Sequence, residues 1–331
     1  MSIELAGLGN AIMDALIGID DDAVLTELGV SRGQMTLVDH ARWHAVYDRL
    51  HHHGVDVHAG GSCANTVATA AILGARARYC GQVGDDRFGL LYGESLEAAC
   101  GAHALRTVPG AVSGKCLSLI SRSDGERTML TDLGVAGQFG VLAEFADVIR
   151  SARVVHFEGY LFLPGASRDV AWEAVRAAKA AGVPISFDCA DPFVAHAIRD
   201  DVEKLLREFV TIAFLNREEA EAITGLGAYP AVDVVGSWVP YAIVKLGGEG
   251  SLVHHEGRTA HIPVFPTVVR DTTGAGDSYA GGFLYGWLKG WSPKMCGELG
   301  SRVASLTVGQ VGAVCRDRTA MNAALNATEA G

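Results

Sequence analysis

The sequence has few of the features that mark membrane, nucleic-acid-binding or fibrous proteins. It contains no apolar run of about 18 residues, the length that spans a membrane, and its start lacks the positively charged segment of a signal peptide. Against 38 Asp and Glu it has only 27 Lys and Arg, which gives a net charge of −11. It also has no long run of basic residues that could bind the phosphate backbone of a nucleic acid. Only 9 residues are proline, and the 41 glycines follow no triplet repeat. We therefore expect a globular cytoplasmic protein that binds neither membranes nor nucleic acids.

Cysteine and histidine are not spaced as metal ligands. The seven cysteines are odd in number and widely separated, with no Cys-x-x-Cys pair, which is typical of reduced thiols packed as small core residues. The histidines at 51–53 and 254–255 have no partners at the spacing of a metal site. We predict that both histidine runs lie on solvated surface.

The composition of the 331 residues supports a large core, because 49% are hydrophobic and 20% are charged. No repeat or flexible linker divides the chain, so we expect a single domain over 1–331. Short apolar runs alternate with helical patterns, which predicts a doubly wound, mostly parallel α/β sheet with helices on both faces. The expected strands are 5–9, 183–187, 210–215 and 241–246, and the expected helices are 65–73, 168–181 after Ser167 as N-cap, 201–209, 217–224, one from Ala275, and one from Pro293 after Ser292 as N-cap.

One segment breaks this alternation. Strand-like runs at 115–121 and 127–131 flank Ser123-Asp124-Gly125, and Asp-Gly between two such runs is a hairpin signal. We expect the hairpin to belong to a small accessory β-sheet that acts as a lid, formed by segments around 11–38 and 107–133.

The segment Asp271-Thr272-Thr273-Gly274-Ala275-Gly276-Asp277 gathers small residues where a helix is expected to begin. Free N–H groups at a helix start bind anions, and Asp277 would lie in the first turn beside that anion. A phosphoryl group next to a carboxylate that can take a hydroxyl proton is the arrangement of a small-molecule kinase. The alternative is a tight turn in which Asp277 only stabilises the helix dipole.

Two further clusters could bind hydroxyl groups. Gly60-Gly61-Ser62-Cys63-Ala64-Asn65 precedes a predicted helix, and the Asn65 amide can both donate to and accept from vicinal hydroxyls. Gly9-Asn10 follows the first predicted strand, and Asp14 nearby could bind two hydroxyls of a furanose. Each cluster, taken singly, could equally serve only as a helix cap.

Two other glycine-containing segments do not fit known phosphate-binding loops. Residues 110–116 are one residue short of a Walker A motif, end in Cys116 and open a predicted strand instead of a helix. Residues 7–12 lack the third glycine of a dinucleotide-binding fingerprint. The sequence therefore favours neither a P-loop enzyme nor a Rossmann dehydrogenase.

Taken together, the glycine pair near residue 60 and the segment near residue 271 resemble the two signature motifs of the PfkB (ribokinase-like) carbohydrate kinases. The order of the motifs, their spacing and the chain length match that family over nearly the whole sequence. The resemblance implies a ribokinase-like fold with a small β-sheet lid and an ATP-dependent phosphotransferase reaction. In that reaction Asp277 is the catalytic base, and the amides of Gly274, Ala275 and Gly276 form the anion hole for the transferring phosphoryl group.

The resemblance extends to the nucleotide side of the site. Residues 216–219 are similar to the family's Asn-x-x-Glu, which implies that Glu219 organises Mg²⁺ through water. Residues 245–250 are similar to a glycine turn that lies along ATP. The ATP-binding residues implied in this way are Asn216, Lys245, Gly247, Gly248 and Gly250. Asp271 and Thr273, with the backbone of 308–312, match the region that holds a K⁺-type ion in some members.

On the acceptor side, the family places substrate-contacting residues after a strand that corresponds to 152–156 here. Glu158 lies at that point, although it could also be a glutamate of a surface loop. The substrate-binding residues implied by the resemblance are Asn10, Asp14, Gly60, Gly61, Ser62, Asn65 and Glu158. Because lid sheets of this family often pair, a homodimer through the lid is a further expectation.

The acceptor itself is less clearly specified. Residues 7–14, 34–39 and 127–129 are similar to adenosine kinases, although fructokinases and ribokinases share much of this pattern. A purine needs an apolar slot, and the expected lid lining is apolar, whereas Glu158 would suit an extra sugar hydroxyl. The expected lining residues are Met35, Leu37, Leu133, Val135 and Phe139, with Phe162 across the cleft. We expect a nucleoside kinase, with a fructokinase or ribokinase and a non-catalytic nucleoside or sugar sensor as alternatives.

Overall fold

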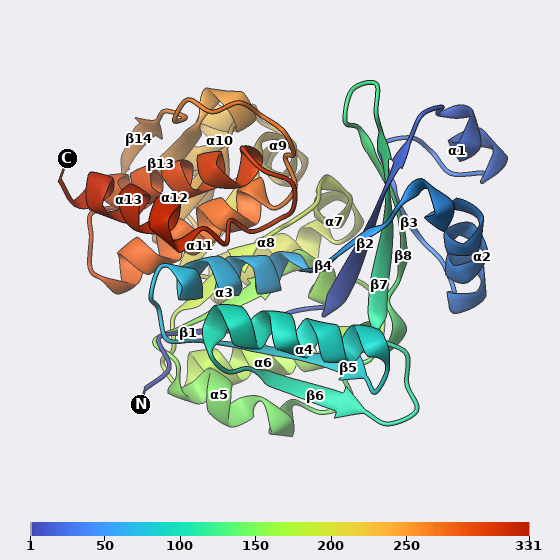
Figure 1. The fold of residues 1–331 in the computed structure, drawn as a ribbon. Helices are drawn as coiled ribbons and strands as arrows, with labels where there is room; N and C mark the ends of the chain where they lie inside the picture. The colour runs from blue at the N-terminus through green and yellow to red at the C-terminus, as the bar shows by residue number, and fades with distance from the viewer. Residues whose placement is uncertain (1, 331) are drawn as a thin grey trace.

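The computed structural model describes residues 2–330 as a large α/β body beside a second, smaller sheet (Figure 1). Nine strands form the body sheet in the order β14-β13-β12-β11-β10-β9-β1-β5-β6. Strands β1, β5, β6 and β9 to β12 run parallel, and β13 and β14 are antiparallel at one edge, which confirms the predicted mostly parallel sheet. Their bounds are β1 Leu5–Leu8, β5 Ala77–Gly84, β6 Ala104–Val108, β9 Val154–Glu158, β10 Ile185–Asp188, β11 Ile212–Asn216, β12 Tyr241–Lys245, β13 Ser251–His255 and β14 Arg258–Ile262.

Helices cover both faces of this sheet, because successive strand residues point to opposite sides and both sides are apolar. In β11, Ile212 and Phe214 join one buried cluster, and Ala213 and Leu215 join the other. The helices on the Phe214 side are α3 Ser62–Ile72, α4 Arg87–Cys100, α11 Ala275–Leu288, α12 Pro293–Val308 and α13 Arg318–Glu329. Those on the other side are α5 Ala146–Ser151, α6 Ser167–Ala180, α7 Pro192–Ala197, α8 Arg199–Glu208, α9 Arg217–Thr224 and α10 Ala228–Gly236.

The helix boundaries follow local signals where those signals are strong. Helix α9 has the predicted bounds and ends at Gly225, which adopts a left-handed conformation with φ of 75°. Ser292 caps α12 as predicted, accepting a hydrogen bond from the Met295 N–H at 3.3 Å. Ser167, in contrast, is not an N-cap: it is the first residue of α6, and its hydroxyl accepts from the Phe139 N–H at 3.4 Å. The Ser167 hydroxyl, which was predicted to cap the helix, therefore takes part in a tertiary contact instead.

The smaller sheet has the order β3-β8-β7-β2-β4 and its own core. Strands β7 and β8 are antiparallel, which confirms the hairpin predicted around Asp124-Gly125. Helices α1 Ala23–Glu27 and α2 His40–Leu50 cover the outer face of this sheet (Figure 1). Trp43 of α2 belongs there to one buried apolar cluster with Ile17 and Leu117. The strand bounds are β2 Ile12–Ile19, β3 Met35–Leu37, β4 Asp56–Gly60, β7 Gly114–Ser121 and β8 Arg127–Asp132.

The histidine runs differ from each other. His51, His52 and His53 are exposed, as predicted. His254 is buried and its ring nitrogen lies 3.1 Å from Asp233, so the prediction of solvated surface is wrong for His254. His255 stacks on Tyr241 and remains partly exposed. Both residues lie in β13, a strand packed between its neighbours. Within residues 2–330 no helix is both long and apolar enough to cross a membrane.

Candidate active site

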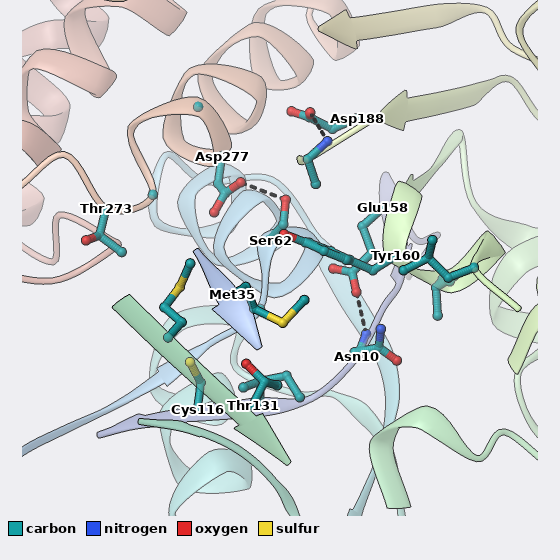
Figure 2. A pocket seen from close by; sticks show the side chains of 18 of the residues that line it. Asn10, Met35, Ser62, Cys116, Thr131, Glu158, Tyr160, Asp188, Thr273 and Asp277 are labelled. Atoms are coloured by element: carbon teal, nitrogen blue, oxygen red, sulfur yellow. Dashed lines mark hydrogen bonds between the residues drawn. The ribbon is translucent and has the colours of Figure 1, made fainter. Parts of the chain in front are cut away.

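A cavity of about 560 Å³ opens between the body and the smaller sheet, at the carboxyl ends of the parallel strands. Strands β5 and β6 lie on one side of β1, and β9 to β12 lie on the other, so the chain reverses its winding between β1 and β9. Ligands of open α/β sheets bind at such a switch point. Asn10 and Glu158 line the cavity directly after β1 and at the end of β9, and Asp188 lines it at the end of β10 (Figure 2).

The start of helix α11 forms one wall of the cavity. Gly274 is its N-cap and has a φ of 67°; a Cβ there would lie 2.2 Å from the Ala313 carbonyl oxygen, so the position requires glycine. Within the described chain, the N–H groups of Gly274 and Gly276 have no protein acceptor, and that of Ala275 makes one 3.3 Å bond to the Thr272 oxygen. The predicted cluster of available N–H donors is therefore present at a helix start.

Asp277 lies in the first turn of α11 and is held by the start of α3. Ser62 Oγ donates to one carboxylate oxygen at 2.7 Å (Figure 2), and Asn65 Nδ2 donates to the other at 2.9 Å. Burial raises the pKa of Asp277 to about 6, although the hydrogen bonds from Asn65 and Ser62 oppose the shift. Two residues predicted to contact substrate thus orient the predicted base, 215 and 212 residues away in sequence.

Asp14, on β2, faces the same cavity from the smaller sheet. A Cβ on Gly60 would lie 2.1 Å from Asp14 Oδ2, and one on Gly61, which has a φ of 93°, would lie 2.5 Å from the Asn10 oxygen. No side chain or N–H group within residues 2–330 donates to the Asp14 carboxylate, and burial raises its pKa to about 6 against the charge of Arg127. Gly60 therefore lets the backbone approach a carboxylate that retains its accepting capacity, and Gly61 lets it approach the Asn10 backbone oxygen.

Glu158 is a buried residue, not the surface-loop glutamate considered above, since only 1% of it is exposed. Its two carboxylate oxygens accept from the N–H groups of Asn10 and Cys63, both at 2.8 Å. Burial raises the pKa of Glu158 to about 7. The side-chain oxygen Oδ1 of Asn10 is buried without a hydrogen-bond partner, which leaves one unpaired acceptor at the cavity wall.

A buried ion pair lies beside the start of α11. Lys245 Nζ is 2.7 Å from Asp188 Oδ2 and would be 3.0 Å from a Cβ on Gly276, so the ammonium group lies beside the N–H groups of α11. Burial alone would lower the pKa of Lys245, but Asp188 and Glu219 outweigh this effect and raise it above its ordinary value. Lys245 is therefore a fixed positive charge.

Asn216 and Glu219 form a capping box at the start of α9. The Asn216 N–H donates to Glu219 Oε2 and the Asn216 side-chain N–H to Oε1, both at 2.8 Å. Burial raises the pKa of Glu219. Each Glu219 carboxylate oxygen accepts one of these hydrogen bonds and keeps a further lone pair, and Glu219 lines the cavity. Its role in organising Mg²⁺ stays a prediction. Across residues 2–330 no group of three or more His, Cys, Asp or Glu side chains is arranged to hold a metal ion.

The glycine turn after β12 places only one of its three predicted residues in the cavity. Gly247 lines it, with a φ of 62°. Gly248 is not part of the lining, and neither is Gly250, which has a φ of 93° and a Cβ position only 2.0 Å from the Ile262 oxygen. Gly250 shapes the turn that presents Gly247.

Asp271 joins two loops behind the start of α11. It accepts hydrogen bonds from the N–H groups of Thr273 and Gly312, each at 2.9 Å, and from the Thr273 hydroxyl. Burial would raise the pKa of Asp271, but these hydrogen bonds hold it below its ordinary value. Asp271 thus stays ionised next to the 308–312 backbone.

The predicted apolar lining is only partly present. Met35, Leu37 and Leu133 line the cavity, whereas Val135, Phe139 and Phe162 are buried outside it. Phe162 packs edge-on against Trp172 and Phe187, with ring centroids 5.4 and 6.0 Å away, because the 3-10 helix Gly159–Phe162 turns it into the core. The neighbouring residues Leu161 and Leu163 line the cavity instead.

Sequence reasoning did not single out several lining residues. Asp188 follows the strand predicted at 183–187, and a carboxylate at the end of a buried strand was a usable signal. Arg127, Met129 and Thr131 alternate along β8 and so share its cavity face, which the alternation of side chains in a strand could have indicated. The first two belong to residues 127–129, whose similarity to adenosine kinases carried no prediction of a role at the site. Tyr160 had no such signal; its hydroxyl donates to Asp191 at 2.9 Å.

Comparison with known proteins agrees with this architecture. The model of the pfkB family carbohydrate kinases matches residues 33–318. An adenosine kinase from Sinorhizobium meliloti is 32% identical, with a TM-score of 0.90 and coverage of 99% of this chain and 100% of that one. A probable sugar kinase from Rhizobium etli CFN 42 is 30% identical, with a TM-score of 0.90 and coverage of 99% of both chains.

A third relative supports the same grouping from sequence alone. The adenosine kinase of Saccharomyces cerevisiae is 28% identical over 343 residues, which cover 94% of this chain and 96% of that protein. The motifs, the fold and the similarity all extend over nearly the full length. The chain therefore belongs to the pfkB family of carbohydrate kinases and is a phosphotransferase with an alcohol group as acceptor.

Proposed function

We propose that this kinase transfers the γ-phosphate of ATP to the primary hydroxyl of a nucleoside such as adenosine, with Asp277 as the general base. The observation that carries the proposal is the placement of Asp277, with a pKa of about 6, between the available N–H groups of α11 and the unpaired carboxylate of Asp14. A base with a pKa near 6 is ionised at neutral pH and still accepts a proton from a polarised hydroxyl.

The acceptor is held from the side of Asp14. A carboxylate without protein donors can accept from two vicinal hydroxyls of a furanose, and the unpaired Asn10 Oδ1 can accept from a third donor. This geometry directs the 5′-hydroxyl toward Asp277. Binding both reactants in one cavity supplies the orientation that an in-line transfer needs.

The nucleotide phosphates bind at the start of α11. The N–H groups of Gly274 and Gly276 and the Lys245 ammonium group stabilise the negative charge that develops on the transferring phosphoryl group. Asn216 and Gly247 lie along ATP. Glu219 would hold Mg²⁺ through water, and the ion would neutralise part of the charge of the phosphates. Asp271 and Thr273 border a site for a monovalent cation such as K⁺.

The smaller sheet acts as a lid, and the lining of its cavity face favours a nucleobase. Met35, Leu37, Met129 and Leu133 present apolar side chains there, and Leu37 is 55% exposed, so a bound ring would cover it. An apolar slot of this kind suits a purine, which makes little polar demand. The name of the Sinorhizobium meliloti relative, adenosine kinase, agrees with this assignment.

A free-sugar kinase is the second candidate function. Arg127 and Thr131 lie on the same lid face, and their donors could satisfy the additional hydroxyls of fructose or ribose. The relative from Rhizobium etli is described as a probable sugar kinase. The presence of Arg127 on the cavity face of the lid is thus the observation that favours a free-sugar kinase.

Initial rates with ATP and Mg²⁺ test the proposal, using adenosine, ribose, fructose and fructose 6-phosphate as acceptors at several concentrations each. We expect the highest kcat/KM for adenosine. A kcat/KM for fructose or ribose well above that for adenosine would transfer the assignment to the sugar kinases. Acceptor binding without turnover of any of the four would instead support the non-catalytic sensor.

A further inference from the structure

The smaller sheet is joined to the body by four short connections, and polar side chains of the body hold each one. Asp86 accepts from the Ser113 N–H at 2.8 Å, which fixes the connection between β6 and β7. Gln82 Nε2 donates to the Val135 oxygen at 2.6 Å, which fixes the chain after β8. The remaining two connections, between β1 and β2 and between β4 and α3, are held by one residue, Glu158.

We propose that Glu158 is a positioning residue that sets the distance between the acceptor site and the catalytic base by binding both of these connections at once. The proposal rests on the proposed function, because it concerns the same acceptor and the same base. It assigns Glu158 a role toward the backbone, in place of the contact with substrate hydroxyls that the family resemblance implied.

The geometry of the carboxylate carries this inference. Oε1 accepts from Asn10, which lies between β1 of the body and β2 of the smaller sheet, and Oε2 accepts from Cys63, in the first turn of α3. A Cβ on Gly9 would lie 2.9 Å from Oε2 and 2.6 Å from the Cys63 Cβ, so the two connections pack directly against Glu158 and against each other. One side chain thus fixes both segments.

One of these two connections leads to the residue proposed to bind the acceptor, and the other leads to the residues that hold the proposed base. The first leads into β2 and carries Asp14, which faces the acceptor. The second leads into α3, where Ser62 and Asn65 hold the Asp277 carboxylate. A shift of either segment away from Glu158 would therefore change the separation of Asp14 and Asp277, and a misplacement of about 1 Å can cost up to about 100-fold in rate.

A carboxylate is well suited to this position because it offers two acceptors and no donor. In Glu158→Gln the amide would direct N–H donors at one backbone N–H, so one of the two connections would lose its bond. Glu4 provides a matched control: it is a buried glutamate at the start of the chain, away from the cavity, and it accepts from the Arg76 N–H at 2.9 Å. Glu4→Gln should affect stability without affecting the acceptor site.

The kinetic test compares Glu158→Gln with Glu4→Gln, using adenosine, 2′-deoxyadenosine and 3′-deoxyadenosine as acceptors. Positioning predicts that kcat/KM falls roughly 10- to 100-fold by the same factor for all three acceptors in Glu158→Gln, and by less than about 3-fold in Glu4→Gln. If Glu158 instead contacts a hydroxyl, the deoxy acceptor that lacks this hydroxyl loses much less than adenosine does. That result overturns the proposal.

A second readout does not depend on the acceptor or on turnover. Hydrogen exchange in the free protein should be at least about 10-fold faster in Glu158→Gln than in wild type for at least one of the segments 9–14 and 61–66, and unchanged in both in Glu4→Gln. Unchanged protection of both segments in Glu158→Gln contradicts the proposal even if the enzyme turns out to act on a sugar. Should Glu158→Gln not fold, Glu158→Asp, which keeps the charge but is too short to reach both N–H groups, undergoes the same comparison.

Discussion

Burial raises the pKa of four carboxylates that line the cavity, those of Asp14, Glu158, Glu219 and Asp277. Burial raises the pKa of Asp14 and of Asp277 to about 6, and that of Glu158 to about 7. Each is ionised in the active enzyme under the proposed mechanism. Burial disfavours the charged form of such a group, so its ionisation lowers the free energy of unfolding. The pKa values that suit proton transfer in this cavity therefore come with a loss of stability.

At the scale of single residues, the first prediction concerns the base. Asp277→Asn keeps the size of the side chain but cannot accept the hydroxyl proton, so kcat should fall on the order of 10²–10⁴-fold with little change in KM. Steady-state kinetics measures this. Asp147→Asn, at an exposed position of α5, is the control and should leave kcat unchanged. Turnover near wild type in Asp277→Asn would remove Asp277 from the mechanism.

The second prediction concerns Asp14 and stability. Because its folded-state pKa of about 6 lies above the ordinary value of 3.8, the folded protein binds this proton more tightly than the unfolded chain does. The ionised carboxylate therefore lowers stability above pH 6, and this loss disappears as the pH falls toward 4. Asp14→Asn should raise the free energy of unfolding at pH 7.5 by about 1–3 kcal/mol, with a smaller gain at pH 4.5, and should weaken acceptor binding.

Asp86 serves as the control for this experiment, because its substitution should change stability in the opposite direction. Burial would raise the pKa of Asp86, but hydrogen bonds from Ser113 and Gly89 hold it below its ordinary value. Asp86→Asn should therefore lower the melting temperature at pH 7.5. A lower melting temperature for Asp14→Asn at pH 7.5 would show that the Asp14 carboxylate is stabilised by partners and is not free for a ligand.

At the scale of elements, the N-terminus of α11 depends on the conformation of one residue. Gly274→Ala places a side chain at a φ of 67° and 2.2 Å from the Ala313 oxygen, so the first turn of α11 must move. We expect kcat/KM for ATP to fall at least 10-fold, on the scale of losing an oxyanion donor, while acceptor binding without nucleotide persists. Kinetics and calorimetry measure the two effects.

Gly290 offers a matched control for this substitution. It also has a positive φ, 76°, but a Cβ there would meet nothing within 4 Å. Gly290→Ala should cost about 1 kcal/mol of stability from the backbone conformation and leave ATP turnover unchanged. Equal losses of activity in both variants would mean that the start of α11 does not hold the phosphate.

At the scale of the whole molecule, the outer face of the smaller sheet has an apolar core separate from the two clusters of the body. Trp43 centres the core of the smaller sheet, stacking on Tyr47 at 5.0 Å and lying 5.2 Å from the Lys115 ammonium group. Trp43→Ala should destabilise this sheet by about 3–5 kcal/mol and leave the body folded. Hydrogen-exchange mass spectrometry should show faster exchange in β2, β7 and β8, with β9 to β11 protected as in wild type.

The matching substitution in the body is Trp172→Ala, on α6, where Trp172 packs against Phe162. It should increase exchange in the body strands near α6. If Trp43→Ala speeds exchange throughout residues 2–330 at one rate, the two sheets unfold as a single cooperative unit, and independent opening of the lid is excluded.

The sequence by itself determined the elements whose signals are local and the family to which they belong. Helix α9 with Gly225, the Ser292 cap of α12 and the hairpin at Asp124-Gly125 depend on a few neighbouring residues, so they could be predicted. The small residues around Gly274 identified the helix start for the same reason. Such signals act within one turn of the backbone and need no knowledge of tertiary contacts.

Only the tertiary structure decided which groups meet. Asp277 is held by Ser62 and Asn65 from more than 200 residues away, and Glu158 binds two backbone segments that the sequence separates by about 50 residues. The same long-range packing buried His254 and turned Phe162 into the core. These arrangements follow from how sheets and helices stack, and side chains gain or lose their pKa shifts only when that stacking excludes water.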